Sequence, residues 1–297
     1  MPDPDIQIEL IKDFWNKNPV GTNFINDEIG MNFFSDYDEF RYKTEPHILK
    51  ELDTYDFVGK RVLEIGLGQG ADSMKIIDRG ALFYGIDLTE ESIKRVEARF
   101  SIFEKIYNEL KVAKAEDIPY PDSYFDIIYS HGVIHHSPNI RKIVEEIFRV
   151  LKPGGQAIVM LYHKNSINYW VSINFIRRVG LLFLLLFPPL KYLLAKITGE
   201  DVPRLSKHLK NFKQSGISYL RMKNFIHKST DGPDNVYSSV WTSKDARNLF
   251  KSFKNSKTKV YFLNERHLLG LQKIMPKSLK QNIARKFGWH LWIISQK

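Results

Sequence analysis

The sequence predicts an α/β protein with a doubly wound, mostly parallel seven-stranded sheet and a helical insertion after strand five. Three observations predict this class. Short buried strands alternate with helices over residues 46–162, the alternation stops over 163–241, and it resumes over 242–297. Strands joined by helices of this length form parallel sheets with helices on both faces. A length of 297 residues suits one such core with a large insertion.

The individual elements follow from apolar runs and from the glycines and prolines that end them. Strands are expected at residues 61–65, 82–86, 124–129, 157–162, 257–263 and 290–295. Helices are expected at residues 46–55, 71–79, 89–100, 140–151 and 243–253. A Pro-Gly-Gly break at 153–155 should separate the fourth helix from its strand. Residues 1–45 are aromatic and polar, and their weak periodicity indicates short helices with loops.

Residues 163–241 are expected to form a separate, mainly helical insertion. It contains the most apolar run of the chain, 179–190, with basic residues on both sides of it within 177–196. Twelve residues are too few to span a bilayer as a helix, which needs about 20, and Pro188-Pro189 would break one. Three roles stay open for this run: the core of the insertion, a dimer face, or peripheral contact with an anionic membrane.

The net charge of +10 is unevenly distributed along the chain. Residues 1–150 hold 18 basic and 28 acidic side chains, whereas residues 151–297 hold 26 basic and 6 acidic ones. The second half therefore either faces an anionic partner or only solubilises the protein. The chain has no cysteine, which excludes disulfide frameworks, thiolate nucleophiles and Cys-ligated metals. With an acidic N-terminus that lacks a signal-peptide pattern, this favours the cytoplasm, with peripheral membrane association as an alternative.

The segment VLEIGLGQG, residues 62–70, is a strand followed by a glycine-rich turn and a helix. Glycines allow the backbone to turn sharply and let a ligand approach closely. Gly66, Gly68 and Ala71 also satisfy the dinucleotide fingerprint, so NAD must be weighed. Three features count against NAD: Glu64 places a carboxylate beside the loop, Asp87 can bind ribose hydroxyls, and an acidic, proline-rich loop at 115–126 can border an adenine.

Four segments in order resemble class I S-adenosylmethionine-dependent methyltransferases of type 11 or 12. They are VLEIGLGQG, YGIDLTEESI, AEDIPYPDSYFDIIYSHGVIHH and VLKPGG, within residues 46–162, and a weaker similarity extends over 243–297. The resemblance implies a Rossmann-like fold, S-adenosyl-L-methionine as cofactor and S-adenosyl-L-homocysteine as product. It also implies that 46–162 bind the cofactor, that 1–45 form a lid or substrate segment, that 163–241 build the acceptor pocket, and that 242–297 complete the sheet.

The resemblance further implies a role for each matching residue. Glu64 supports the loop and acts through water on the methionine ammonium, and Asp87 binds the ribose hydroxyls. The other residues that should contact the cofactor are Gly66, Gly68, Gly70, Leu88, Ala115, Glu116, Asp117 and Ser130. Where the family often has an Asp that binds the adenine amino group, this chain has Lys114, so that contact passes to Glu116 or Asp117, or is lost.

Two further groups of side chains are candidates with an open structural alternative. Trp15, Phe40, Arg41 and Tyr42 form a lid in which Tyr42 contacts the cofactor, or else these N-terminal aromatics fill the core. His131, His135 and His136 follow strand four, where one of them can be a general base, or all three pack locally. We expect no metal, because the His-x-x-x-His-His run has no further ligand nearby.

Three functions remain to be compared at this stage. The first is methyl transfer to a small-molecule or lipid-like acceptor, most simply at a hydroxyl oxygen. The second is RNA methylation, which the basic half favours, but strand four ends in Ser130-His-Gly-Val and lacks the Asn/Asp-Pro-Pro-aromatic motif of enzymes that methylate exocyclic amines, so we do not expect nucleic acid. The third is a non-catalytic scaffold, which would predict a damaged glycine loop, whereas this loop is intact. An oligomer is compatible with all three.

Overall fold

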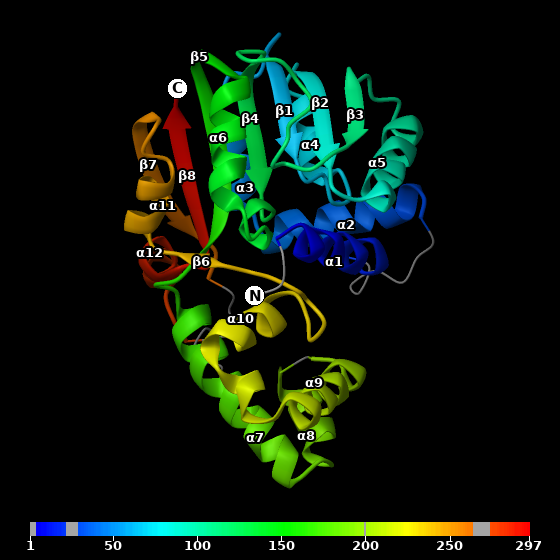
Figure 1. Ribbon diagram of the computed structural model, residues 1–297, viewed down its shortest axis with the longest axis vertical. Helices are drawn as coiled ribbons and strands as arrows, with labels where there is room; N and C mark the ends of the chain where they lie inside the picture. The colour runs from blue at the N-terminus through cyan, green and yellow to red at the C-terminus, as the bar shows by residue number, and fades with distance from the viewer. Residues whose placement is uncertain (1–3, 22–28, 199, 264–273) are drawn as a thin grey trace. The chain divides into compact units, whose positions relative to one another are not determined.

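The computed structural model describes residues 4–21, 29–198, 200–263 and 274–297 (Figure 1). The chain divides into two compact units. Unit 1 combines Met1–Leu161, Ser243–Lys259 and Trp292–Lys297. Unit 2 combines Tyr162–Thr242 and Val260–Leu291. Each unit is therefore assembled from segments that are distant in sequence.

Unit 1 contains the sheet and its helices, and three of its strands continue into unit 2. The strands are β1 (Arg61–Ile65), β2 (Leu82–Asp87), β3 (Glu109–Val112), β4 (Phe125–His131), β5 (Leu151–His163), β7 (Lys254–Tyr261) and β8 (His290–Gln296). The helices are α1 (Pro4–Lys17), α2 (Met31–Thr44), α3 (His47–Leu52), α4 (Ala71–Ile77), α5 (Glu90–Ile102), η1 (Ile134–His136), α6 (Ile140–Val150) and α11 (Ser243–Leu249).

The strand order is β3-β2-β1-β4-β5-β8-β7, with the short strand β6 (Val240–Trp241) paired to β5 off this path. The pairs from β3 through β5 are parallel. Backbone hydrogen bonds join Gly154 to Lys297 and His163 to Trp289, so β8 runs antiparallel to β5. This confirms the predicted doubly wound, mostly parallel sheet with seven strands on its main path.

The order of the strands fixes where a ligand can bind in unit 1. The chain passes from β1 to β2 in one direction and from β4 to β5 in the other, so right-handed crossovers put α4 and α5 on one face and α6 on the other. Strand order reverses between β1 and β4, and open α/β sheets bind ligands at the carboxyl edge of that point. In Figure 1, α1 and α2 lie across this edge.

Buried apolar residues explain why the central strands could be found in the sequence. In β1 every residue after Arg61 is buried, as expected for a strand covered on both faces. Helix α5 starts at a cap in which the Thr89 side chain accepts a hydrogen bond from the Ser92 backbone N–H. Helix α6 presents Ile140, Ile143, Val144, Ile147 and Val150 to the core.

Several predicted boundaries were wrong. The expected helix 46–55 is limited to α3, and residues 1–45 contain two helices of 14 residues, not short ones. Strand β3 was not predicted. The Pro-Gly-Gly segment does not separate helix from strand: β5 begins at Leu151, and its register with β4 shifts so that 153–155 form a bulge within the strand.

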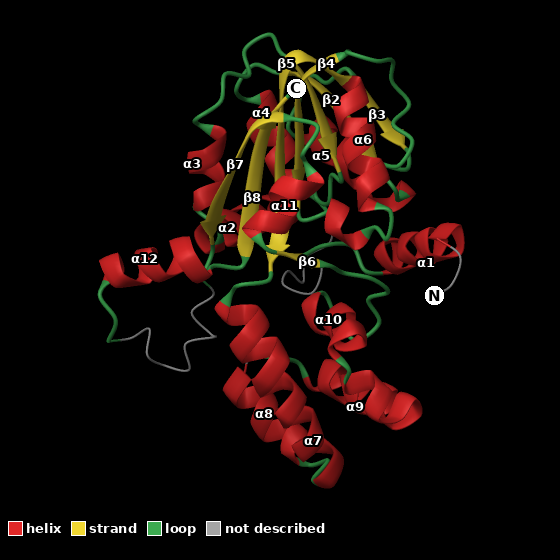
Figure 2. Ribbon diagram, turned by 60° about the vertical axis from the view of Figure 1, so that its left-hand side comes forward, coloured by secondary structure: helices red, strands yellow, loops and turns green. Residues whose placement is uncertain are grey.

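Unit 2 is mainly helical (Figure 2). Its helices are η2 (Asn168–Arg177, a π-helix), α7 (Arg178–Leu186), α8 (Leu190–Thr198), α9 (Val202–Ser215), η3 (Gly216–Leu220), α10 (Met222–Thr230) and α12 (Lys277–Phe287). Helices η2, α7, α9, η3 and α10 enclose an apolar cluster of this unit, which includes Ile173, Leu181, Leu184, Phe212 and Phe225. The apolar run 179–190 is too short by itself to span a bilayer, but η2 continues into α7 and forms one helix over Asn168–Leu186, which ends before Pro188-Pro189.

Candidate cofactor and catalytic site

The loop after β1 turns at three glycines that all adopt positive φ angles: 79° at Gly66, 54° at Gly68 and 72° at Gly70. A Cβ atom at Gly66 would lie 2.2 Å from Val133 Cγ2, so this glycine allows the loops after β1 and β4 to pack together. A Cβ atom at Gly68 would meet only Val20, at 4.0 Å. Gly68 is therefore the position where a ligand can approach the backbone.

Asp87 joins the end of β2 to this loop. Its Oδ2 accepts a hydrogen bond from the Leu67 backbone N–H at 2.8 Å, and its Oδ1 accepts from the Thr89 N–H at 2.9 Å and the Thr89 hydroxyl at 2.8 Å. The side chain is only partly buried. A carboxylate has about four lone-pair sites, so Asp87 retains acceptor capacity for a ligand hydroxyl. Leu88 follows it and is also partly exposed.

Glu64 lies inside β1, with 3% of its surface exposed. The Ser73 hydroxyl of α4 donates a hydrogen bond to Glu64 Oε2, so the residue does hold the loop and helix together. Burial, followed by the nearby Asp72, raises the pKa of Glu64 well above its ordinary value. Because burial favours the neutral form, the Glu64 carboxylate is weaker evidence against NAD than the sequence suggested.

The predicted adenine border lies between β3 and β4. Glu116 is buried and accepts a hydrogen bond from the Ser137 hydroxyl, whereas Asp117 is exposed and Ala115 is partly buried. Lys114 Nζ lies 3.3 Å from Glu9 Oε1 on α1. The residue that departs from the family pattern therefore pairs with the N-terminal helix. Ser130, expected beside the methionine, donates its hydroxyl to the Ile65 carbonyl at 3.0 Å and links β4 to β1.

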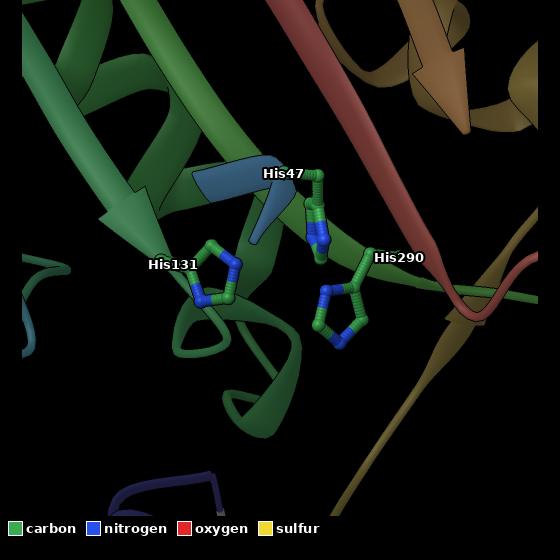
Figure 3. A group of neighbouring side chains, drawn as sticks. All are labelled: His47, His131 and His290. Atoms are coloured by element: carbon green, nitrogen blue, oxygen red, sulfur yellow. The ribbon is translucent and has the colours of Figure 1, made fainter. Parts of the chain in front are cut away.

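His131 ends β4, and His47 at the start of α3 lies near it (Figure 3). Arg41 Nη2 lies 3.3 Å from His131 Nδ1. Since a guanidinium can only donate, Nδ1 accepts and the ring proton resides on Nε2. Burial, followed by the charge of Arg41, lowers the pKa of His131 well below its ordinary value. While Arg41 keeps this contact, His131 is neutral and its Nδ1 already accepts a hydrogen bond, so Nδ1 cannot take a proton from a substrate.

Arg41 also forms a buried ion pair that the sequence did not reveal. Its Nε donates to Asp72 Oδ1 at 2.9 Å and its Nη2 to Asp72 Oδ2 at 2.6 Å. The hydroxyls of Tyr129 and Tyr42 donate to the same carboxylate at 2.8 and 3.2 Å. Tyr42, predicted to contact the cofactor, thus directs its hydroxyl to Asp72. Neither the 31-residue separation of Arg41 and Asp72 nor any local pattern signals this pair.

The N-terminal segment is fastened to the candidate site at several further points. Gln69 Nε2 donates to the Val20 carbonyl at 2.6 Å, and Arg99 pairs with Asp38 of α2. Phe33, Phe34 and Tyr37 of this segment are buried and fill the core, whereas Phe40 is 39% exposed. The lid over the cofactor stays a prediction. Phe24 lies outside the described residues.

His135 and His136 lie in η1 and are both buried. The Trp15 ring of α1 packs edge-on against His136, with ring centroids 5.2 Å apart. The two histidine rings are themselves neighbours, with centroids 4.4 Å apart. The structure therefore places His136 against the N-terminal helix and His135 beside it, in the loop that directly follows His131.

Residues 63–159 match the family model described as methyltransferase domain. This segment is a class I methyltransferase domain. Its match covers the glycine loop, Asp87, the adenine border and all three candidate histidines. The cofactor of class I methyltransferase domains is S-adenosylmethionine. The open backbone at Gly68 and the remaining acceptor capacity of Asp87 fit a nucleoside of this kind.

Curated relatives of the methyltransferase domain act on different acceptors. An alignment with sterol 24-C-methyltransferase of Pneumocystis carinii shows 34% identity over 119 residues and covers 39% of this chain and 29% of that protein. The chain is 30% identical over 124 residues to ubiquinone biosynthesis O-methyltransferase of Pseudomonas fluorescens, covering 40% and 51%. A phosphoethanolamine N-methyltransferase of Caenorhabditis elegans is 28% identical over 138 residues, covering 46% and 30%. The chain thus spans about half or less of the length of these three relatives.

Solved structures share the fold of the methyltransferase domain at low sequence identity. A methyltransferase described in complex with the Trm112 activator of Haloferax volcanii has a TM-score of 0.53 and 14% identity, with 96% of each chain covered. An S-adenosylmethionine-dependent methyltransferase from Mesorhizobium loti has a TM-score of 0.51 and 14% identity, with 89% of this chain and all of that chain covered. These similarities support the fold alone.

Proposed function

We propose that the protein transfers a methyl group from S-adenosylmethionine to a small-molecule or lipid-like acceptor, most simply at a hydroxyl oxygen. One observation carries the proposal: the Asp87 carboxylate ends β2 and is hydrogen-bonded to the glycine loop beside the open backbone of Gly68. A carboxylate at this place can accept from ribose hydroxyls, and the loop leaves room for the rest of a nucleoside.

The acceptor class is supported by the names of the relatives. The relatives are named for sterol, ubiquinone biosynthesis and phosphoethanolamine, which are lipids or small molecules. Methylation at oxygen, carbon and nitrogen all occur among them, so the choice of oxygen is the finer part of the proposal. We assign the choice of acceptor to residues 1–45 and 163–241, which lie outside the matched domain. The lack of cysteine favours a cytoplasmic enzyme.

The bound cofactor would supply an electrophilic methyl group on a sulfonium. The residues around it would then need to hold the acceptor oxygen about 3–3.5 Å from that methyl group and in line with the breaking bond. A hydroxyl acceptor must also lose its proton. His131 Nδ1 accepts from Arg41, so we assign the general base to His135 or His136.

Transfer of labelled methyl groups tests this proposal. Purified protein is incubated with methyl-labelled S-adenosylmethionine and, separately, with a lipid extract, a set of small hydroxylated metabolites, and total RNA. We expect label in the lipid or metabolite fraction. Label confined to RNA would contradict the acceptor class, and RNA methylation would replace it.

Asp87→Asn is the diagnostic variant, and Asp56→Asn is its matched control. Both aspartates accept a hydrogen bond from the backbone N–H two residues later, but Asp56 precedes β1 at the opposite edge of the sheet. We expect Asp87→Asn to weaken S-adenosylhomocysteine binding at least about tenfold in calorimetry, since hydrogen bonds to charged groups contribute about 1.5–3 kcal/mol. Equal binding by both variants would count against the role of Asp87.

A further inference from the structure

The end of α7, the turn after it and the start of α8 form a cluster of exposed apolar side chains, here called the apolar tip. Its members are Leu182, Phe183, Leu185, Leu186, Phe187, Tyr192 and Leu193, which are between 39% and 69% exposed. Large apolar residues scattered singly on a surface are common, but seven within twelve positions form a patch. Such patches mark contacts with proteins or membranes.

The other side of the same helix is anchored in unit 2. Ile173, Leu181 and Leu184 are almost fully buried in the apolar cluster of this unit. The core positions of this helix are therefore occupied by other residues, and the exposed side chains of the apolar tip lie on a different face. The helix has one apolar face that packs in unit 2 and a second apolar face that is exposed and available to a binding partner.

Within residues 168–196 the charges are of one sign, and the first acidic residues after them are Glu200 and Asp201 at the start of α9. Residues 168–196 contain no Asp or Glu and four basic residues, two before the tip (Arg177, Arg178) and two in α8 (Lys191, Lys196). Lys191 Nζ lies over the Tyr192 ring, 5.2 Å from its centroid, and Lys196 is exposed. Apolar side chains next to cations match an anionic lipid surface, where headgroups attract the cations and acyl chains accept the apolar groups.

Two adjacent arginines argue against a helix that crosses the bilayer. Asn168–Leu186 is, among the described residues, the helix that has the length and composition for crossing. Arg177 and Arg178 lie at its middle, however, and a charged residue at the bilayer centre costs about 2.5–3.5 kcal/mol even on the most favourable scales. Arg177 is also held by the Ser229 carbonyl at 2.8 Å, within unit 2. A helix held in this way can insert its end but not its whole length.

We infer that the apolar tip is a docking surface for an anionic membrane, inserted at the level of the headgroups and upper acyl chains. This inference goes beyond the proposed function and is tied to it only through the lipid-like acceptor, which a docked enzyme could take from the bilayer. A membrane contact through 177–196 is one of the three roles that the sequence left open. Leu181 and Leu184 of the run belong to the core of the insertion, and the inference concerns the exposed residues of the same run.

Vesicle sedimentation tests the inference with the full chain. Vesicles of phosphatidylcholine alone are compared with vesicles that also contain phosphatidylglycerol. The test variant is Leu186→Glu/Phe187→Glu, and the control is Ile217→Glu, since Ile217 of η3 is as exposed as Leu186, at 69%. We expect salt-sensitive binding to anionic vesicles, a loss of at least about tenfold in the test variant, and no change in the control. Lys196→Gln, which removes one positive charge, should lose about fivefold, the equivalent of about 1 kcal/mol per basic residue near the surface.

Other outcomes overturn the inference. These are no vesicle binding by the wild-type chain, equal binding by the test variant, or resistance to extraction by high salt and alkaline carbonate, which would indicate a spanning helix. A dimer in light scattering that the test variant dissociates, without vesicle binding, would assign the apolar tip to a second copy of the chain. S-adenosylhomocysteine binding is measured on the same samples. If it persists while vesicle binding fails, only the docking inference is lost.

Discussion

The Arg41–Asp72 pair offers the sharpest test of how α2 is held against the glycine loop. Asp72 is 4% exposed and receives four hydrogen bonds, two from Arg41 and one each from Tyr129 and Tyr42. Arg41→Gln removes the positive charge and leaves a buried carboxylate with only its two tyrosine donors. Breaking a buried pair from one side costs about 3–5 kcal/mol. The Arg41 side chain is 17% exposed, so we expect about 3 kcal/mol.

The pH dependence of this loss has a defined sign. Burial alone would raise the pKa of Asp72, but Arg41 and the tyrosine hydroxyls outweigh it and hold the pKa below its ordinary value. The stabilisation from this carboxylate is therefore present above its unfolded pKa, about 3.9, and is lost as the pH falls further. In Arg41→Gln the same pKa rises, and Asp72 takes up a proton in the folded state. The stability difference from wild type should be largest at neutral pH and shrink on acidification.

Urea unfolding measures both effects. Far-ultraviolet circular dichroism gives the urea midpoint of each variant at each pH. Arg41→Gln/Asp72→Asn should be about 1–2 kcal/mol more stable than Arg41→Gln, since it leaves no unpaired charge. Surface substitutions alone change the free energy of unfolding by up to about 0.5 kcal/mol, so an effect of Arg41→Gln within that range would refute a buried, stabilising pair. A difference in free energy of unfolding between Arg41→Gln and wild type that does not vary with pH would also refute it.

Two further predictions concern stability. Gly66→Ala should lower the urea midpoint more than Gly59→Ala does. Both glycines have positive φ, which costs an alanine about 1 kcal/mol, but only at Gly66 does the new Cβ meet Val133 at 2.2 Å, at a further cost of about 1–3 kcal/mol. Equal midpoints of the two variants would contradict the close packing at Gly66. His208 Nδ1 is hydrogen-bonded to the Tyr219 hydroxyl at 2.8 Å. Burial, followed by the charges of Arg177 and Arg204, lowers the pKa of His208 from 6.5 to about 3. The unfolded chain protonates His208 at a higher pH than the folded chain does, so the free energy of unfolding should fall by up to about 1.4 kcal/mol per pH unit as the pH drops from 6.5 towards 3. His208→Gln should remove this slope when unfolding is measured over that pH range. An unchanged slope would show that another group causes it.

The sheet and the glycine loop could be predicted because their signals are local. A parallel strand buried on both faces is a continuous apolar run, as in β1, and the glycines after it mark where the backbone must turn. Strand β3 was not predicted, because Glu109–Val112 is short and only partly buried and contains no apolar run. The bulge in β5 escaped because Pro153 and Gly154 usually end an element, whereas here Gly154 donates its N–H to Lys297 across the sheet.

The candidate site was less predictable than the fold, since its contacts join residues far apart in sequence. The segment that carries Arg41 and Tyr42 has weak helical periodicity, and nothing in it signals that both side chains reach Asp72. The charge state of Glu64 follows from burial and from Asp72, which only the folded chain brings near it. The length of the helix ending at Leu186 was underestimated because η2 contains polar residues and does not show the α-helical period.

Calorimetry with two ligands tests the central claim, that Asp87 beside the glycine loop holds the ribose of an adenosyl cofactor. S-adenosylhomocysteine is compared with its analogue lacking both ribose hydroxyls, on the wild-type chain and on Asp87→Ala. The account predicts that the wild-type chain binds the analogue about 10- to 100-fold more weakly, from hydrogen bonds of about 1.5–3 kcal/mol to a charged group, and that Asp87→Ala binds both ligands equally weakly. Equal affinity of the wild-type chain for both ligands, or an undiminished preference in Asp87→Ala, would contradict it.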